Sequence, residues 1–222
     1  MKENKYDDNI FFQKYSQMSR SQQGLAGAGE WETLRKLLPD FKDKRVLDLG
    51  CGYGWHCIYA MEHGASSVVG VDISHKMLEV AKEKTHFPQV EYKCCAIEDV
   101  EFSEESFDVI LSSLAFHYVA DYEILVKKIY RILKSGGKLV FTVEHPVFTA
   151  YGTQDWHYNE KGEILHFPVD NYYYEGKRTA VFLGEKVTKY HRTLTTYLNT
   201  LLSNGFIINH IVEPQPPENM MD

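Results

Sequence analysis

A buried-strand pattern over residues 45–49 runs directly into three glycines, Gly50, Gly52 and Gly54, and a helical pattern begins at Trp55. Glycine tolerates positive φ and carries no Cβ, so a loop of this kind lets the backbone come close to a bound ligand. The segment therefore restricts the chain to folds in which a strand, a tight loop and a helix together form a ligand site.

A second strand pattern, residues 67–71, ends in Asp72, 24 residues after Asp48. In nucleotide-binding βαβ units an acidic residue about 20 residues further along accepts hydrogen bonds from ribose hydroxyls. Strand, glycine loop, helix, strand and acid in this order predict a nucleoside-type cofactor at the loop. A tight strand-to-helix turn that holds no ligand is the alternative.

Strand and helix patterns keep alternating after Asp72. The predicted strands cover residues 45–49, 67–71, 90–94, 107–111 and 138–143. A strongly amphipathic helix follows Asp121 and is ended by Gly136 and Gly137. This alternation is typical of parallel βαβ units, so we predict an α/β fold. Its sheet is Rossmann-like, open, twisted and mostly parallel, with helices on both faces.

Charge and composition exclude several classes of partner. The 24 Lys and Arg residues against 31 Asp and Glu residues leave a formal charge of −7, which opposes a surface built to neutralise nucleic-acid phosphates. No apolar run approaches the roughly 18 residues of a membrane helix, and the N-terminus lacks a signal-peptide core. The four cysteines match no zinc spacing, so no metal site is predicted, and the adjacent Cys94 and Cys95 suit a cytoplasmic protein.

The residues around the loop indicate which nucleoside it binds. Trp55 stands where the dinucleotide fingerprint has its third glycine, beside the pyrophosphate, and an indole is a poor substitute there. Asp48 and Asp72 end the first two predicted strands and Glu98 follows the third, and carboxylates around one crevice disfavour a pyrophosphate but suit a cation. S-adenosylmethionine has a sulfonium, an ammonium and a ribose diol but no phosphate, so it fits these residues.

The sequence resembles a known family, the class I S-adenosylmethionine-dependent methyltransferases, and in particular their small-molecule branch. The matching motifs are residues 46–54, 69–74, 107–114 and 133–139. The resemblance covers roughly residues 40–145 well and the rest more loosely. It implies S-adenosylmethionine as cofactor, S-adenosylhomocysteine as its product, and a cofactor site made of Tyr15, Arg20, Asp48, Gly50, Cys51, Gly52, Asp72, Ile73, Ala96, Ile97, Glu98, Ser113 and Leu114.

The resemblance also implies roles for these residues. Asp48 and the backbone at Gly50 hold the methionine end of the cofactor, and Asp72 holds the ribose. Ile97 and its neighbours flank the adenine.

Two further pairs are placed at the methionine end by the same resemblance. Ser113 and Leu114 lie near the amino group. Tyr15 and Arg20 belong to a leading helix that closes over the carboxylate, although a helix that merely packs on the domain is the alternative.

The chain departs from the family pattern at two places. Ala96 stands where the family often has an acid, so the adenine amino contact is expected to pass to Glu98 or to backbone. The family fold usually has a seventh, antiparallel strand, and the sequence ends at Asp222, nine residues after Glu213. We expect either that a strand from the Tyr-rich region after residue 145 takes that place or that the chain is a shortened version.

Methyl transfer from a sulfonium is an in-line displacement, in which alignment and exclusion of water dominate and a general base is optional. His117, after the fourth strand, is the first candidate base, and His145, after the fifth, is the second. The pair at residues 191–192, His and Arg, could bind an anionic group, and the three tyrosines at residues 172–174 could form an aromatic wall. For each of them an ordinary packing role is the alternative.

We therefore predict one domain over residues 1–222 that transfers a methyl group to a small-molecule O, N or C nucleophile. Residues 1–40 form a helical lid, residues 41–145 the cofactor-binding core, residues 146–192 a Tyr-rich insertion over the substrate, and residues 193–222 a helix, a strand (206–212) and a tail. The alternatives are an NAD-linked oxidoreductase, a non-catalytic nucleoside-binding protein and a methylase of tRNA or protein. The sequence leaves the acceptor and the oligomeric state open.

Overall fold

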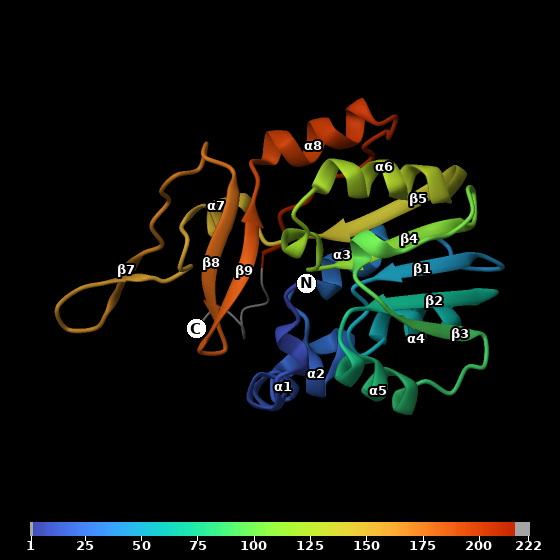
Figure 1. Ribbon diagram of the computed structural model, residues 1–222, viewed down its shortest axis with the longest axis horizontal. Coiled ribbons are helices and arrows are strands. Elements are labelled where there is room, and N and C mark those ends of the chain that lie inside the picture. The colour runs from blue at the N-terminus through green and yellow to red at the C-terminus, as the bar shows by residue number, and fades with distance from the viewer. Residues whose placement is uncertain (1, 216–222) are drawn as a thin grey trace.

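Five parallel strands form the central sheet of the computed structural model, which describes residues 2–215 (Figure 1). The strands are β1 (Arg45–Leu49), β2 (Ser67–Asp72), β3 (Val90–Cys94), β4 (Phe107–Ser113) and β5 (Leu133–Thr142). They lie in the order β3-β2-β1-β4-β5, and all four pairings are parallel. The predicted open parallel sheet is confirmed.

Helices cover both faces of this sheet. Those in the core are α3 (Trp31–Leu37), α4 (Trp55–Glu62), α5 (His75–Lys84), α6 (Tyr122–Ile132) and α8 (Leu194–Ser203). Successive β1 side chains point to opposite faces, so Leu47 and Leu49 join the core under α6 and α8, whereas Val46 joins the core under α4 and α5. Asp48 consequently points toward α4.

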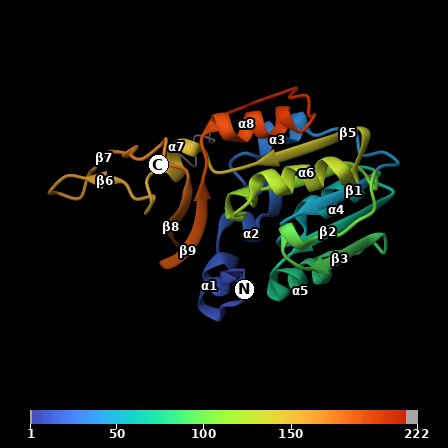
Figure 2. The same ribbon diagram turned by 45° about the horizontal axis from the view of Figure 1, so that its top comes forward.

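Two further segments stand at the carboxyl ends of the strands (Figures 1 and 2). The first contains η1 (Lys5–Asp7), α1 (Asn9–Ser16), α2 (Ser19–Gln22) and η2 (Gly24–Gly27). The second, the Tyr-rich region, contains α7 (Pro146–Ala150) and the hairpins β6 (His157–Tyr158) with β7 (Ile164–His166) and β8 (Gly176–Phe182) with β9 (Glu185–His191). Phe11 of α1 is fully buried against Ala180 and Val187, so the two segments share a core.

The predicted strand over residues 206–212 is wrong, because the structure assigns no strand there. Phe206 and Ile208 still pack against the main core, but the segment from residue 205 to Pro214 shares a cavity of about 1490 Å³ with β5 instead of pairing with it. The expectation that a Tyr-rich strand joins the sheet is also wrong for the described residues, since β6–β9 pair only among themselves. The last seven residues of the predicted tail lie outside the described part.

The boundary between α6 and β5 also differs from the prediction. The helix ends at Ile132, before Gly136 and Gly137, and β5 begins at Leu133. Leu133 pairs with Phe107 of β4, so tertiary pairing ends the helix before the glycines do. Within residues 2–215 no helix is long and apolar enough to cross a membrane.

Candidate functional site

The glycine loop follows β1 as predicted and has the backbone conformation that requires glycine. Gly50, Gly52 and Gly54 all have positive φ, at 77°, 52° and 75°. The N–H groups of Gly50 and Cys51 donate to the carbonyl of Val71 at 2.8 and 2.9 Å. A Cβ on Gly50 would lie 2.5 Å from that of Ala115, so the loop depends on glycine for its close approach to the segment after β4.

Asp72, at the end of β2, faces this loop. Its carboxylate accepts hydrogen bonds from the Gly52 N–H and from the Ser74 N–H, both at 2.9 Å. Burial raises the pKa of Asp72, and these backbone donors oppose the rise. Each carboxylate oxygen keeps a second lone pair for another donor, such as a ribose hydroxyl.

A small cavity of about 70 Å³ lies between the loop and the N-terminal segment. It is lined by Tyr15, Arg20, Ser21, Gly24, Leu25, Ala28, Gly50, Cys51, Gly52, Tyr53, Trp55, His56 and Ser113. Six predicted cofactor residues are among them: Tyr15, Arg20, Gly50, Cys51, Gly52 and Ser113. Pockets for drug-sized ligands span about 300–1,000 Å³, so this cavity is smaller than one that would enclose a whole nucleoside.

Opposite charges meet beside this cavity. Arg20 donates through Nη2 to Glu30 Oε1 at 2.7 Å, and the Ser113 hydroxyl donates to the same oxygen at 3.4 Å. The side chains of Arg20 and Glu30 are 23% and 18% exposed, so both keep a face open. A guanidinium and a carboxylate side by side suit the carboxylate and ammonium of an amino-acid group.

Three residues near the cavity were missed at the sequence level. Glu30 precedes an unremarkable short helix, and only its position ten residues after Arg20 could have suggested a pairing. The Trp55 indole Nε1 is buried and has no hydrogen-bond partner among the described residues. Burial lowers the pKa of His56 to about 4, so this imidazole is neutral at pH 7.

Asp48 lies beneath the loop and does not line the small cavity. Its side chain is 1% exposed, Oδ2 accepts from the Cys57 thiol at 3.5 Å, and Oδ1 has no partner within residues 2–215. Burial raises the pKa of Asp48 to about 7. The predicted contact between Asp48 and the methionine end stays a prediction.

The predicted adenine side of the site is partly covered by the N-terminal segment. Asn4 donates to the Ile73 carbonyl at 3.1 Å, and Asp7 accepts from the Ser74 hydroxyl at 2.6 Å. Ile97 begins η3 (Ile97–Asp99), directly after the buried Ala96. The Glu98 carboxylate lies 3.8 Å from Lys2 Nζ, so the contact of Glu98 with adenine stays a prediction.

The carboxyl ends of β4 and β5 are joined by hydrogen bonds. Leu114 has a positive φ of 53°, and its N–H donates to the carbonyl and the hydroxyl of Thr142 at 3.0 and 3.1 Å. The Thr142 hydroxyl donates to the Ser113 hydroxyl at 3.3 Å. The predicted pair Ser113 and Leu114 is thus held next to the end of β5.

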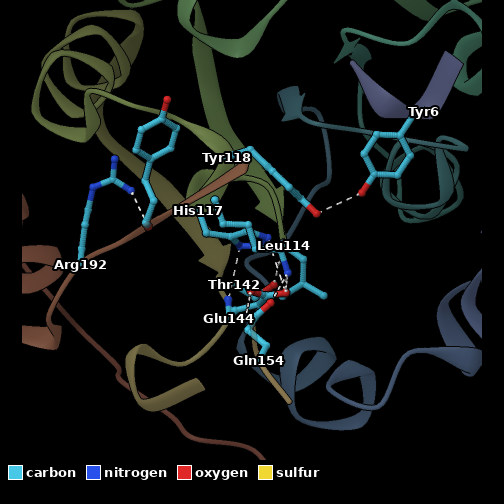
Figure 3. A network of polar contacts seen from close by, with 10 residues as sticks. Tyr6, Leu114, His117, Tyr118, Thr142, Glu144, Gln154 and Arg192 are labelled. Carbon is cyan, nitrogen blue, oxygen red and sulfur yellow. Dashed lines mark hydrogen bonds and ion pairs between the residues drawn. The ribbon is translucent and has the colours of Figure 1, made fainter. Parts of the chain in front are cut away.

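His117 is buried in η4 (Phe116–Tyr118) and faces Glu144 (Figure 3). Its Nδ1 accepts from the Glu144 N–H at 3.5 Å, and its Nε2 lies 3.9 Å from Glu144 Oε1. Burial lowers the pKa of His117 to about 4. The imidazole is therefore neutral and faces a carboxylate, and the role of His117 as a base stays a prediction.

His145 lies in a different environment. Its Nδ1 accepts from the Val147 N–H at 3.1 Å, which caps α7, and its Nε2 lies 2.5 Å from Glu213 Oε1. It lines the larger cavity beside β5 and not the small cavity at the glycine loop. These contacts give no support to His145 as a base.

The two predictions from the Tyr-rich region are not supported either. His191 is fully buried between the Thr149 hydroxyl and the Tyr172 carbonyl, each at 2.8 Å, and Arg192 is buried while donating to backbone carbonyls, including that of Ala120 at 3.0 Å. Neither is free to bind an anion. Tyr173 and Tyr174 are 87% and 74% exposed, so they do not form a wall over a buried site.

The chain is similar to a known protein family and to two solved structures. Residues 47–141 match the family described as a methyltransferase domain. A Listeria monocytogenes structure assigned to the S-adenosylmethionine-dependent methyltransferases is 58% identical with a TM-score of 0.82, over 85% of this chain and 88% of that one. A Mesorhizobium loti S-adenosylmethionine-dependent methyltransferase is 40% identical with a TM-score of 0.81, over 88% and 89%.

One curated relative has a more specific name. The ubiquinone biosynthesis O-methyltransferase of Coxiella burnetii is 36% identical over 50% of this chain and 47% of its own length. The chain thus spans about half of that relative. Among the described residues no group of three or more His, Cys, Asp or Glu side chains could hold a metal ion.

Proposed function

The chain belongs to the class I S-adenosylmethionine-dependent methyltransferase family, and from this we propose that it methylates a small-molecule O, N or C nucleophile. The interlocking of the two segments over the carboxyl ends of the strands carries the proposal. Lys14 Nζ donates to the Leu183 carbonyl at 2.9 Å, and Glu3 accepts from the Thr188 N–H at 3.1 Å, in addition to the shared core around Phe11. A closed aromatic cover suits a small acceptor better than a polymer.

Other observations support a small acceptor. The name of the Coxiella relative describes an O-methyltransferase of ubiquinone biosynthesis. The net charge of −7 is unfavourable for a nucleic-acid substrate. An NAD-linked oxidoreductase is set aside, because the comparisons identify a methyltransferase. A cytoplasmic location stays a prediction.

The residues at the loop suit S-adenosylmethionine, which when bound supplies a methyl group on a positively charged sulfur. We infer that Arg20 and Glu30 bind its amino-acid end and that Asp72 accepts from its ribose hydroxyls. These side chains fix the cofactor across the carboxyl ends of β1, β2 and β4. Orientation and exclusion of water account for most of what a protein must add to such a displacement.

We further infer that the N-terminal segment to residue 40 and the insertion at residues 146–192 act as lids on the core of residues 41–145. In the closed arrangement, the Tyr15 ring lies 6.0 Å from that of Tyr53 in the glycine loop. Opening of the N-terminal segment would release this contact together with the Asp7–Ser74 hydrogen bond. The cofactor could then enter over Asp72.

Two measurements test the proposal. Calorimetry should detect binding of S-adenosylhomocysteine, and release of S-adenosylhomocysteine from S-adenosylmethionine should depend on a member of a panel of small phenols, alcohols, amines and carbon acids. Turnover with tRNA or protein but with no small molecule would overturn the small-acceptor proposal. Binding without turnover of any acceptor would indicate a non-catalytic protein.

Replacing Arg20 by alanine should raise the dissociation constant of S-adenosylhomocysteine about tenfold, since a charge-assisted hydrogen bond contributes about 1.5–3 kcal/mol. Calorimetry measures the change. Arg35→Ala is the matched control, because Arg35 forms the same kind of pair with Glu32, at 2.8 Å, on the exposed side of α3. Equal affinity of the Arg20 variant and the control would remove Arg20 from the site.

A further inference from the structure

A buried ion pair between the core and the insertion lies beside the carboxyl end of β5. Glu144, two residues after β5, bonds through Oε1 to Lys189 Nζ of β9 and through Oε2 to Gln154 Nε2 at 2.9 Å. Lys189 Nζ also donates to Gln154 Oε1 at 2.9 Å. Burial acts to raise the pKa of Glu144, but the ion pair with Lys189 and the hydrogen bond from Gln154 oppose it and lower that pKa, so the carboxylate is ionised.

The members of this cluster differ in exposure. The side chains of Lys189 and His117 are 4% and 2% exposed, whereas that of Glu144 is 20% exposed. Glu144 is therefore the most exposed of the three side chains, and Lys189 and His117 are the more deeply buried.

Aromatic side chains connect the cofactor loop to this cluster. The Tyr15 ring lies 5.2 Å from the ring of Tyr6, whose hydroxyl is 3.3 Å from that of Tyr118 (Figure 3). The Tyr118 ring lies 5.9 Å from Lys189 Nζ. Tyr6, Tyr15 and Tyr118 are all partly exposed, so their rings offer flat apolar surface between the loop and the ion pair.

The cluster is also close to the predicted methionine end. Ser113 pairs with Thr142 across β4 and β5, and their hydroxyls are hydrogen-bonded at 3.3 Å. Glu144 follows Thr142 by two residues, a rise of about 7 Å in an extended chain. Glu144 and the predicted methionine end therefore lie at the same edge of the sheet, at the carboxyl ends of β4 and β5.

We propose that Glu144 is a catalytic residue that binds the hydroxyl group of a neutral, planar acceptor and accepts its proton during methyl transfer. Lys189 holds the carboxylate in place through their ion pair. His117 is a positioning residue that acts through Glu144. This inference rests on the proposed small-molecule function and adds to it the class of acceptor, a phenol-like hydroxyl compound.

The charges of the pair select this class. A carboxylate acceptor would be repelled by the more exposed Glu144 carboxylate. A neutral hydroxyl can donate a hydrogen bond to this carboxylate. The three tyrosine rings favour a flat molecule over a branched aliphatic one.

The step conserves atoms and charge. The acceptor O–H bond breaks and its proton passes to the Glu144 carboxylate. An O–CH₃ bond forms as the S–CH₃ bond breaks, and the electron pair of that bond stays on sulfur. The products are an aryl methyl ether, S-adenosylhomocysteine and a protonated Glu144, which returns its proton to water.

Glu144→Gln tests the base, because the amide keeps the shape of the side chain but cannot take the proton. The variant and the wild-type protein are compared on a set of phenols of graded acidity. For weakly acidic phenols the turnover of Glu144→Gln should be 100-fold or more below that of the wild type, since a positioned base contributes about 10²–10⁴ in rate. For nitrophenols, which are largely ionised at the assay pH, the deficit should shrink to a few-fold. A merely structural role would reduce turnover equally for all phenols.

Binding gives a second readout that needs no turnover. With S-adenosylhomocysteine bound, calorimetry should show that Glu144→Gln binds a weakly acidic phenol about tenfold more weakly than the wild-type protein does, because a charge-assisted hydrogen bond is lost. The corresponding aryl methyl ether has no hydroxyl donor, so its affinity should stay within twofold. Glu101→Gln is the matched control, since Glu101 also pairs with a lysine, Lys128, at 3.1 Å, but is 74% exposed.

If Glu144→Gln fails to fold, Glu144→Asp keeps the charge and should give an intermediate loss with the same dependence on phenol acidity. A deficit independent of acidity, or equal weakening of phenol and ether, overturns the role of Glu144. Methylation of amines alone by the wild-type protein overturns the hydroxyl class while the small-molecule function stands. Failure of the wild-type protein with every small acceptor overturns the proposed function itself.

Discussion

Replacement of Asp72 by asparagine is expected to weaken binding of S-adenosylhomocysteine about 100-fold. The carboxylate of Asp72 lies at the end of β2 and already takes one backbone N–H on each oxygen, from Gly52 and from Ser74. Each oxygen retains capacity for one ribose hydroxyl, and a hydrogen bond to a charged acceptor contributes about 1.5–3 kcal/mol. Loss of about 3 kcal/mol corresponds to about 100-fold in the dissociation constant, which calorimetry resolves directly.

The substitution also alters the hydrogen bonds that Asp72 accepts from backbone N–H groups of the loop. The control must therefore replace another aspartate that accepts from a backbone N–H group, at a place away from the loop. Asp108 of β4 accepts from the Arg45 N–H at 2.9 Å at the opposite end of the sheet, and Asp108→Asn should leave the affinity unchanged. A 2′,3′-dideoxy analogue of the ligand should bind the wild-type protein and Asp72→Asn almost equally. Equal losses for the analogue and the parent ligand would show that Asp72 acts on the loop alone.

The cofactor half of the fold could be predicted because its signals are local. Gly50, Gly52 and Gly54 adopt positive φ, and that requirement is visible in the sequence. The β-branched runs before and after them fold into β1 and β2 with the predicted bounds to within one residue. The position of Asp72 at the end of β2 is predicted from its spacing of 24 residues after Asp48.

The contacts that depend on distant partners could not be predicted. Residues 206–212 have strand composition, but a strand needs a neighbour, and β5 does not pair with them in the described part of the chain. The contacts of Phe11 with Ala180 and Val187 join residues about 170 positions apart. Lys189 pairs with Glu144 across 45 residues, a separation that no sequence spacing indicates.

Residue type alone also cannot separate a reactive histidine from a packed one. His117 and His145 both follow strands at the expected edge of the sheet, yet one is buried against Glu144 and the other caps α7. Both histidines lie at the carboxyl ends of the strands, as predicted from the sequence. The carboxylate beside His117, that of Glu144, could be identified only from the structure.

Asp48→Asn should change how the stability of the ligand-free protein depends on pH. Burial raises the pKa of Asp48 to about 7, against an ordinary value of 3.8. Below about pH 4 the side chain is protonated in both folded and unfolded chains, and it contributes no pH dependence. Between the two values the unfolded chain releases a proton that the folded protein keeps, so stability falls as pH rises and levels off above the folded pKa.

The size of this effect follows from the shift. At 1.36 kcal/mol per pKa unit, the loss of stability of the wild-type protein between pH 4 and pH 8 is at most about 4 kcal/mol from this residue. Asparagine does not titrate, so the free energy of unfolding of Asp48→Asn, measured by urea denaturation, should gain on that of the wild type as pH rises from 5 to 8. The comparison concerns the slope, which does not depend on how well the amide packs against Cys57.

Asp108→Asn serves as the control of opposite sign, because the backbone and Lys134 contacts of Asp108 lower the pKa of that carboxyl despite its partial burial. The stability that Asp108 contributes is present above its ordinary pKa and is lost only as pH falls below it, so its replacement should not flatten the curve between pH 5 and pH 8. Parallel curves for the wild type and Asp48→Asn would mean that Asp48 is ionised in the folded protein. It would then be available, as a buried anion beneath the glycine loop, to attract the cationic sulfur nucleoside.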